Sequence, residues 1–126
     1  MHSETQYYIC RKCGNMVVKI LNGGGTLTCC DQEMELLTAN TTDAAQEKHV
    51  PAVTREGNKV HVEIGTVLHP MIPEHYITMI AVAQGAKYQQ IDLKPGQQPT
   101  ADFIVEDGPI TVYEYCNLHG LWKAEA

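Results

Sequence analysis

Lys59-Val60-His61-Val62-Glu63-Ile64, residues 59–64, is the stretch that decides the fold class. Its apolar side chains alternate one by one with polar side chains. Successive side chains of a strand point to opposite faces of a sheet, so this alternation predicts a strand with one buried face. His61 falls on the polar face, which favours an ordinary surface histidine over a metal ligand.

More stretches with strand composition lie on the C-terminal side of this one. Turn signals such as Gln84-Gly85 and Asp107-Gly108-Pro109 separate them. Many short strands at this spacing are typical of a β-sandwich or a small barrel, so we expect a mainly β fold. The expected strands are residues 76–82, 88–93, 101–105 and 110–115.

On the N-terminal side, the polar stretch of residues 38–42 marks a domain boundary. We place the first domain at residues 1–37 and the second at residues 38–126. Just after the boundary we expect one helical turn, because Asp43 and Gln46 have capping-box spacing.

Four of the five cysteines lie in the first quarter of the chain, which sets the first domain apart. Five cysteines cannot all pair with one another, and clustered thiols in a reducing cytoplasm bind metal more often than they form disulfides. About 36 residues cannot bury enough apolar surface to fold alone, so we expect a metal to hold this domain. Four thiolates suit zinc or iron, and the alternative is a set of buried free thiols. The four are Cys10, Cys13, Cys29 and Cys30.

The chain between the two cysteine pairs is expected to form a hairpin. Residues 16–21 and 26–28 would be its strands, with Asn22-Gly23-Gly24-Gly25 as the turn. Adjacent residues of a strand point to opposite faces, so binding one metal through both Cys29 and Cys30 requires a local distortion of the backbone.

A second set of possible ligands, four histidines and one cysteine, lies in the second domain. Imidazoles suit iron, zinc, copper or nickel, and a thiolate favours the redox metals. Such a set leaves one position open on a six-coordinate metal. A single loop histidine is ordinarily a surface group, but prolines stiffen the loop between two of these histidines, and the last one follows the cysteine closely. The set is His49, His69, His75, Cys116 and His119.

Charge and the first residues restrict the partners and the location that we expect. The net charge of −6 argues against binding to nucleic acid and to an anionic membrane surface. Residues 1–6 are polar and do not look like a targeting signal, and His2 among them is expected to be a surface group. The longest apolar run, residues 79–83, is far shorter than the ~20 residues that span a bilayer. We expect a cytoplasmic protein.

The possible ligands lie in short motifs, namely Cys10-x-x-Cys13, Cys29-Cys30, Glu47-Lys48-His49-Val50-Pro51, His69-Pro70-Met71, His75-Tyr76 and Glu114-Tyr115-Cys116-Asn117-Leu118-His119-Gly120. With these motifs the chain resembles desulfoferrodoxin, the two-iron class of superoxide reductases, over essentially its whole length. The resemblance implies a rubredoxin-like first domain with a distorted iron site on its four cysteines, and an immunoglobulin-like β-sandwich as the second domain. It implies a second iron with the four histidines in its equatorial plane and the Cys116 sulfur as axial ligand. A homodimer and a rubredoxin-like electron donor are implied as well.

The activity that the resemblance implies is the one-electron reduction of superoxide to hydrogen peroxide at a ferrous His4Cys centre, without production of dioxygen. Lys48, beside the ligand His49, would supply a positive field close to the site, and a solvated loop lysine is the alternative. At ~0.15 M salt the screening length is about 8 Å, so only nearby charges act on an approaching anion. Glu47 would ligate the resting ferric iron, and Glu114, near Cys116 in the sequence, could tune the site.

Two other functions fit part of the pattern. A blue-copper electron carrier also uses histidines and a cysteine, but four candidate histidines are too many and no methionine follows Cys116. A zinc ribbon in the stretch from Cys10 to Cys30 could recruit a partner, with the β-domain as a scaffold. The sequence leaves open whether the first iron passes electrons to the second or only stabilises the fold.

Overall fold

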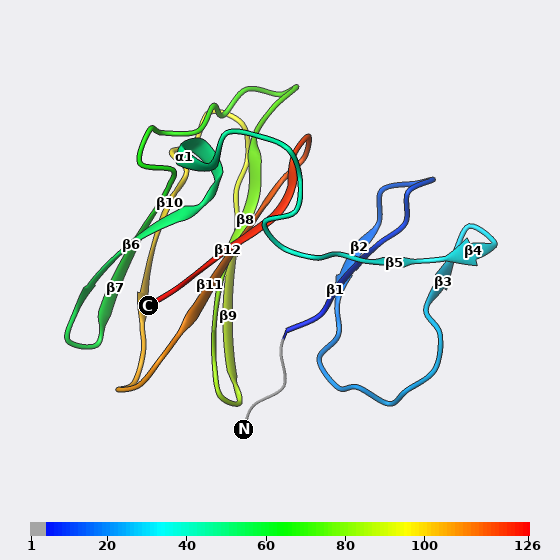
Figure 1. Cartoon of the computed structure of the whole chain (residues 1–126), viewed down its shortest axis with the longest axis horizontal. Coiled ribbons are helices and arrows are strands. Elements are labelled where there is room, and N and C mark those ends of the chain that lie inside the picture. The colour runs from blue at the N-terminus through cyan, green and yellow to red at the C-terminus, as the bar shows by residue number, and fades with distance from the viewer. Residues whose placement is uncertain (1–4) are drawn as a thin grey trace. The chain divides into compact units, whose positions relative to one another are not determined.

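The computed structural model describes residues 5–126 of a chain that divides into two compact units, Met1–Thr38 and Ala39–Ala126. Regular structure in the described residues is almost entirely β, with one short helix (Figure 1). The expectation of a mainly β chain is therefore confirmed. His2 lies outside the described residues. No described helix has the length and apolar character that crossing a membrane requires.

The first unit is built around a three-stranded antiparallel sheet. β1 (Tyr7–Ile9) is central, between β2 (Met16–Val18) and β5 (Glu35–Leu36). β3 (Thr28–Cys29) and β4 (Gln32–Glu33) form a separate antiparallel pair. Strands this short are marginal in water without another constraint, which is the situation that a metal site relieves.

The expected hairpin between residues 16–21 and 26–28 is wrong. β2 ends at Val18 and pairs with β1, whereas the later strand begins at Thr28 and pairs with β4. The connection from β1 to β2 is short and turns at Gly14, whose φ is +86°. Closing a short loop costs less entropy than closing a long one, so β1 is the favoured partner of β2.

The second unit is a sandwich of two antiparallel sheets, which confirms the expected sandwich. Its strands are β6 (Pro51–Glu56), β7 (Lys59–Ile64), β8 (Ile77–Gln84), β9 (Lys87–Asp92), β10 (Thr100–Ile104), β11 (Thr111–Cys116) and β12 (Gly120–Glu125). One sheet has the order β10-β7-β6 and the other β12-β11-β8-β9. β6 and β12, each at the edge of a sheet, are additional to the expected strands.

The core of the sandwich contains the apolar side of β7. Val60, Val62 and Ile64 are buried, as their alternation predicts, and they join one cluster with side chains of β8, β10 and β11. Burial of apolar area stabilises a fold by roughly 25 cal/mol per Å², and close packing makes the interior stiff. Cys116 belongs to this cluster, so one possible metal ligand is anchored in the core.

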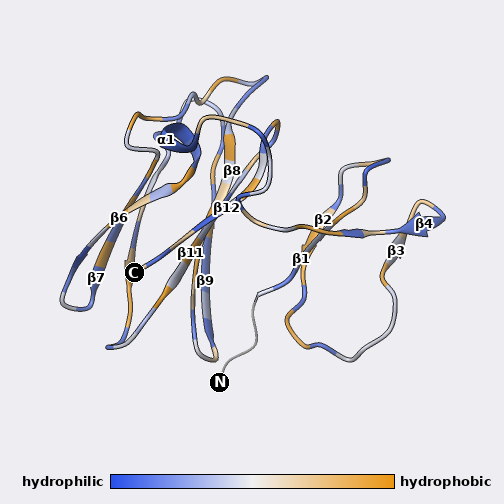
Figure 2. Cartoon of the chain, in the orientation of Figure 1, coloured by the Kyte–Doolittle hydropathy of each residue, from blue (hydrophilic) through white to orange (hydrophobic). Residues whose placement is uncertain are grey.

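The one described helix differs from the expected turn. α1 spans Gln46–His49 and begins after Ala45, without a side-chain cap, so the expected capping by Asp43 is wrong. Figure 2 shows this helix as hydrophilic throughout. An isolated turn of this length is not stable in water, so contacts with the rest of the unit must hold it.

Those contacts come from the connection between β7 and β8. The Glu47 carbonyl accepts hydrogen bonds from the Val67 N–H (3.1 Å) and from the Thr66 hydroxyl (3.3 Å). The turn that carries residues 47–49 is therefore fixed by main-chain and side-chain bonds from an adjacent loop.

Candidate metal centres

Four cysteine sulfurs of the first unit converge. The donor atoms of Cys10, Cys13, Cys29 and Cys30 lie within 4.8 Å of one another, and none of these cysteines forms a disulfide. Cys10 is buried, while Cys13 and Cys30 are exposed. The structure thus brings together the four cysteines that the sequence singles out, at the spacing that a tetrahedral metal site needs.

The adjacent cysteines occupy different backbone conformations. Cys29 ends β3, and Cys30 (φ 54°) and Asp31 (φ 60°) both have left-handed backbones. Neither is glycine, so each conformation costs of order 1–3 kcal/mol that the surrounding structure must offset. This turn lets both sulfurs reach one point, and the expected distortion of the backbone is confirmed.

Asn15 donates hydrogen bonds to two of the cysteine sulfurs. Its backbone N–H donates to the Cys13 sulfur (3.5 Å) and its side-chain amide donates to the Cys29 sulfur (3.8 Å). Hydrogen bonds from the backbone of Cys13 lower the pKa of Cys10 to about 6, and a shared bond with Cys13 raises the pKa of Cys30 to about 12. One thiol therefore ionises readily, and a bound metal would displace the protons held by the others.

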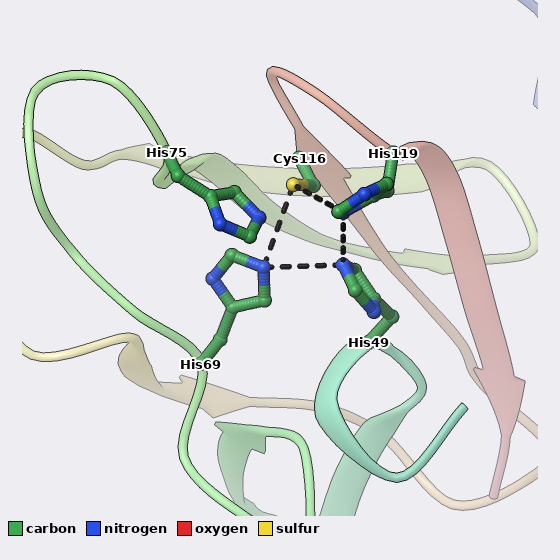
Figure 3. A group of neighbouring side chains, drawn as sticks. All are labelled: His49, His69, His75, Cys116 and His119. Atoms are coloured by element: carbon green, nitrogen blue, oxygen red, sulfur yellow. Dashed lines mark hydrogen bonds between the residues drawn. The ribbon is translucent and has the colours of Figure 1, made fainter. Parts of the chain in front are cut away.

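A second group converges at one end of the sandwich. His49 lies on α1, His69 and His75 lie in the β7–β8 connection, Cys116 ends β11, and His119 lies in the turn before β12. Figure 3 shows the five side chains pointing toward one another, and their donor atoms lie within 4.8 Å of one another. Three separate segments of the chain thus build one site.

Short distances join donor atoms of this group to one another. His49 Nε2 is 3.0 Å from His119 Nδ1 and 3.2 Å from His69 Nε2, and the Cys116 sulfur is 3.4 Å from His69 Nε2 (Figure 3). A metal ion binds imidazole nitrogens at about 2.0–2.1 Å and sulfur at about 2.3 Å, so donors this close to one another suit a shared ion.

Backbone carbonyls fix the orientation of two imidazoles. His49 Nδ1 donates to the Ala45 carbonyl and His69 Nδ1 donates to the Pro70 carbonyl, each at 2.7 Å. A carbonyl can only accept, so Nδ1 carries the proton and Nε2 presents its lone pair to the centre of the group.

Burial favours the neutral form of three histidines, His49, His69 and His75. It lowers the pKa of His69 to about 4, and it also lowers the pKa of His49 and His75. His75 Nε2 is buried without a hydrogen-bond partner in the described structure, which is rare for a polar atom. A metal ion would satisfy this nitrogen.

Burial raises the pKa of the Cys116 thiol, so its thiolate form needs a cation beside it.

A β-bulge aims the Cys116 side chain. Along the pairing of β11 with β8, Tyr115 opposes Met79 but Cys116 opposes Ile77, so the register shifts between the two residues. Bulges bend a strand and redirect its side chains, often beside functional sites. The bulge turns the last side chain of a core strand toward the histidines.

Other residues named from the sequence lie around or away from this group. Glu47 and Lys48 are exposed residues of α1, directly before the buried His49. Glu114 is fully buried, both of its carboxylate oxygens lack a hydrogen-bond partner in the described structure, and burial raises its pKa well above the usual range. His61 lies apart from the group and bonds to Asp102 on the outer face of its sheet, as a surface histidine does.

The sequence analysis missed two residues, of which Trp122 contacts the group and Gly65 lies against the turn that carries His49. The Trp122 ring stacks against the His49 imidazole, with centroids 5.1 Å apart. Gly65 lies against the backbone of Glu47 and Lys48, so closely that a Cβ at this position would approach both within 3.0 Å. A glycine directly after a strand and an aromatic residue just past a Cys-x-x-His motif are weak signals, because each has many ordinary explanations.

Comparison with known families gives two matches that together cover almost the whole chain. The family described as desulfoferrodoxin, N-terminal domain, matches residues 2–37, and the family described as desulfoferrodoxin matches residues 41–125.

Comparison with individual proteins agrees. A desulfoferrodoxin from Desulfarculus baarsii is 47% identical, over 99% of this chain and 99% of its own length. A superoxide reductase from Pyrococcus horikoshii is 32% identical over 70% of this chain and 93% of its own. Among solved structures, the superoxide reductase from Treponema pallidum has a TM-score of 0.77 at 30% identity, over 97% of this chain and 99% of its own.

Proposed function

The chain belongs to the desulfoferrodoxin family, and on this premise we propose that it is a superoxide reductase. The reaction adds one electron and two protons to superoxide and yields hydrogen peroxide, without dioxygen. The observation that carries this function is the convergence of four imidazoles and one thiol, with donor atoms within 4.8 Å of one another.

Both groups of donors suit iron, at two ions per chain. The first ion would be held by Cys10, Cys13, Cys29 and Cys30, within a domain of residues 1–37. The second would be held by His49, His69, His75, Cys116 and His119, within a domain of residues 38–126. When bound and reduced, the second iron supplies the electron that superoxide takes up.

Burial suggests the side from which superoxide approaches. Cys116 is fully buried in the core, whereas His75 and His119 are half-buried and Lys48 is exposed. A small anion can therefore reach the group from the side of these histidines. Lys48 directly precedes His49 on α1, and in this role its ammonium would attract the anion and hold a water that delivers protons.

The function is tested on protein purified without oxygen. We expect two irons per chain, and hydrogen peroxide without dioxygen when superoxide is supplied to the reduced protein. Zinc in place of iron at both groups would contradict the proposed function. So would equal amounts of dioxygen and peroxide, which is the product ratio of dismutation.

Replacement of Lys48 by isoleucine is expected to slow the first reaction with superoxide by about tenfold at low salt, because local attraction of the anion is lost. The loss should shrink as salt rises and screens the charge. Pulse radiolysis over a range of salt concentrations measures this. Lys59→Ile removes the same charge at the exposed start of β7 and should leave the rate unchanged. Equal rates for Lys48→Ile and the unaltered chain at every salt concentration would exclude Lys48 from the mechanism.

Replacement of Glu47 by alanine is expected to leave that first step almost unchanged and to alter the spectrum of the oxidised protein, because the carboxylate binds the resting ferric iron in this proposal. Absorption spectra after oxidation measure this. Glu56→Ala, at the end of β6, is the matched control. A ferric spectrum identical to that of the unaltered chain would count against ligation by Glu47.

We also propose that a rubredoxin-like protein delivers electrons at the rim of the second group. Several apolar side chains next in sequence to the ligands of the second group are about half exposed. They are Val67 (53%), Leu68 (52%), Ile72 (52%) and Leu118 (59%). Exposed apolar side chains gathered around a functional group are typical of a transient protein interface. A homodimer, checked by analytical ultracentrifugation, is part of the same proposal.

Replacement of Val67 by glutamate is expected to slow reduction by rubredoxin several-fold, because a buried charge at an interface is costly. Reduction by a small molecule and the reaction with superoxide should be unchanged. Stopped-flow absorption of the second iron measures its reduction by rubredoxin and by the small molecule, and its oxidation by superoxide. Ile104→Glu, an equally drastic change at an exposed residue of β10, is the control. If rubredoxin reduces the Val67→Glu and Ile104→Glu variants equally slowly, the donor does not bind at this rim.

A further inference from the structure

Trp122 contacts two of the second group's histidines in two different ways. Its ring stacks on the His49 imidazole, with centroids 5.1 Å apart and planes 27° from parallel. Its Nε1–H donates a 3.0 Å hydrogen bond to the main-chain carbonyl of His119. The side chain is 1% exposed, so both contacts are shielded from water.

The two histidines belong to separate segments. His49 lies on α1, a single turn that contributes little stability of its own, and His119 lies in the turn between β11 and β12. Trp122 lies within β12, whose pairing with β11 places it opposite Glu114. A buried residue of a paired strand is a rigid support, so Trp122 can hold both segments against the same sheet.

The His49 imidazole is thereby fixed on two sides. The Ala45 carbonyl accepts from Nδ1 at the edge of the ring, and Trp122 covers one face. The edge contact sets which nitrogen is free, and the face contact restricts the tilt of the ring. Nε2 is then held toward His119 Nδ1, 3.0 Å away.

We infer that Trp122 is a positioning residue of the second metal centre, which holds the His49 ring by stacking and the main chain at His119 by its indole N–H. The inference rests on the proposed iron site and concerns the affinity and geometry of that site. Loss of a partner that orients a metal ligand typically costs about 10- to 100-fold in metal affinity.

The test uses Co²⁺ as the probe and the full chain with its first site filled with Zn²⁺. Trp122→Phe keeps a ring against His49 but lacks the N–H, and Trp122→Leu lacks both contacts. We expect affinity for Co²⁺ to fall about tenfold in the first variant and about 100-fold in the second. The thiolate-to-metal absorption band should shift in both variants. Competition with a chelator of known affinity gives the values.

A control separates positioning from general weakening of the fold. Phe103→Leu removes a buried ring of β10 from the core cluster and should change affinity for Co²⁺ less than about threefold. An equal loss in Phe103→Leu and Trp122→Leu would overturn the inference, as would unchanged affinity and absorption band in Trp122→Phe. If Trp122→Leu does not fold, the comparison of Trp122→Phe with Phe103→Leu decides by the same criteria.

The unaltered chain offers a second measurement, because Trp122 is its single tryptophan. Paramagnetic Co²⁺ bound at His49 should quench the fluorescence of an indole stacked on that ring, and Zn²⁺ should not. Fluorescence that Co²⁺ leaves unchanged would contradict the contact. None of these measurements involves superoxide, so failure of the proposed enzyme activity would leave their outcome unaffected.

Discussion

Replacement of Cys116 by serine is expected to abolish superoxide reduction, with a rate loss of more than about 100-fold, which exceeds the usual cost of losing an outer partner of a metal site. A thiolate pushes electron density onto iron, and a serine hydroxyl stays neutral in a buried site. Pulse radiolysis of the anaerobically reduced variant measures the rate, and the thiolate-to-iron absorption band of the second centre should disappear.

The matched control for this change is Cys13→Ser, because it alters one sulfur of the other group. We expect it to disturb the first iron and to leave the first reaction with superoxide unchanged. Cys116 is also a core residue, and a hydroxyl in its place costs about 1–3 kcal/mol if it finds no partner. Unfolding measurements must therefore accompany the kinetics. A folded Cys116→Ser variant that reduces superoxide at the original rate would exclude the sulfur from the mechanism.

The strands and the four-cysteine group could be predicted from the sequence because both leave local patterns. The alternation in residues 59–64 requires one buried face whichever strands pair with it. The first domain is too small to fold without a constraint, and it contains Cys10, Cys13, Cys29 and Cys30. A metal shared by these cysteines therefore follows from the size and the composition of the domain. These inferences need no knowledge of long-range contacts.

The features that the sequence analysis missed depend on contacts between distant segments. The partner of β2 is decided by competition between β1 and a later strand, which composition does not reveal. The bulge before Cys116 exists only in the pairing of β11 with β8. Trp122 and Gly65 have roles only once α1 lies beside them.

Gly65 illustrates such a contact, and its replacement by alanine has the second largest expected effect. Its φ is +85°, a conformation in which a Cβ costs roughly 1–2 kcal/mol. A Cβ here would also lie 2.7 Å from the Glu47 carbonyl oxygen and 2.8 Å from the Lys48 Cα. Both are backbone atoms, so no side-chain rotation can relieve the clash.

The clash must displace the turn that carries Lys48 and His49 or distort the loop that holds it. Overpacking typically costs about 1–3 kcal/mol, so with the backbone strain we expect Gly65→Ala to lose about 2–5 kcal/mol of unfolding free energy. A displacement of 1 Å at a catalytic group can cost about 100-fold in rate. We therefore expect the superoxide reaction to slow at least tenfold in the fraction that remains folded. Chemical denaturation and pulse radiolysis measure the two effects.

The matched control is Gly57→Ala, in the turn between β6 and β7. Gly57 also has a left-handed backbone, with φ +61°, but a Cβ there meets no atom within 4 Å. The Gly57→Ala variant should have the backbone strain without the clash. Its rate of reaction with superoxide should therefore match that of the unaltered chain. The difference between the two variants isolates the close approach of Gly65 to the backbone of Glu47, Lys48 and Val67. Equal stability and equal rates in both would mean that the close approach of Gly65 does not hold the Glu47–His49 turn.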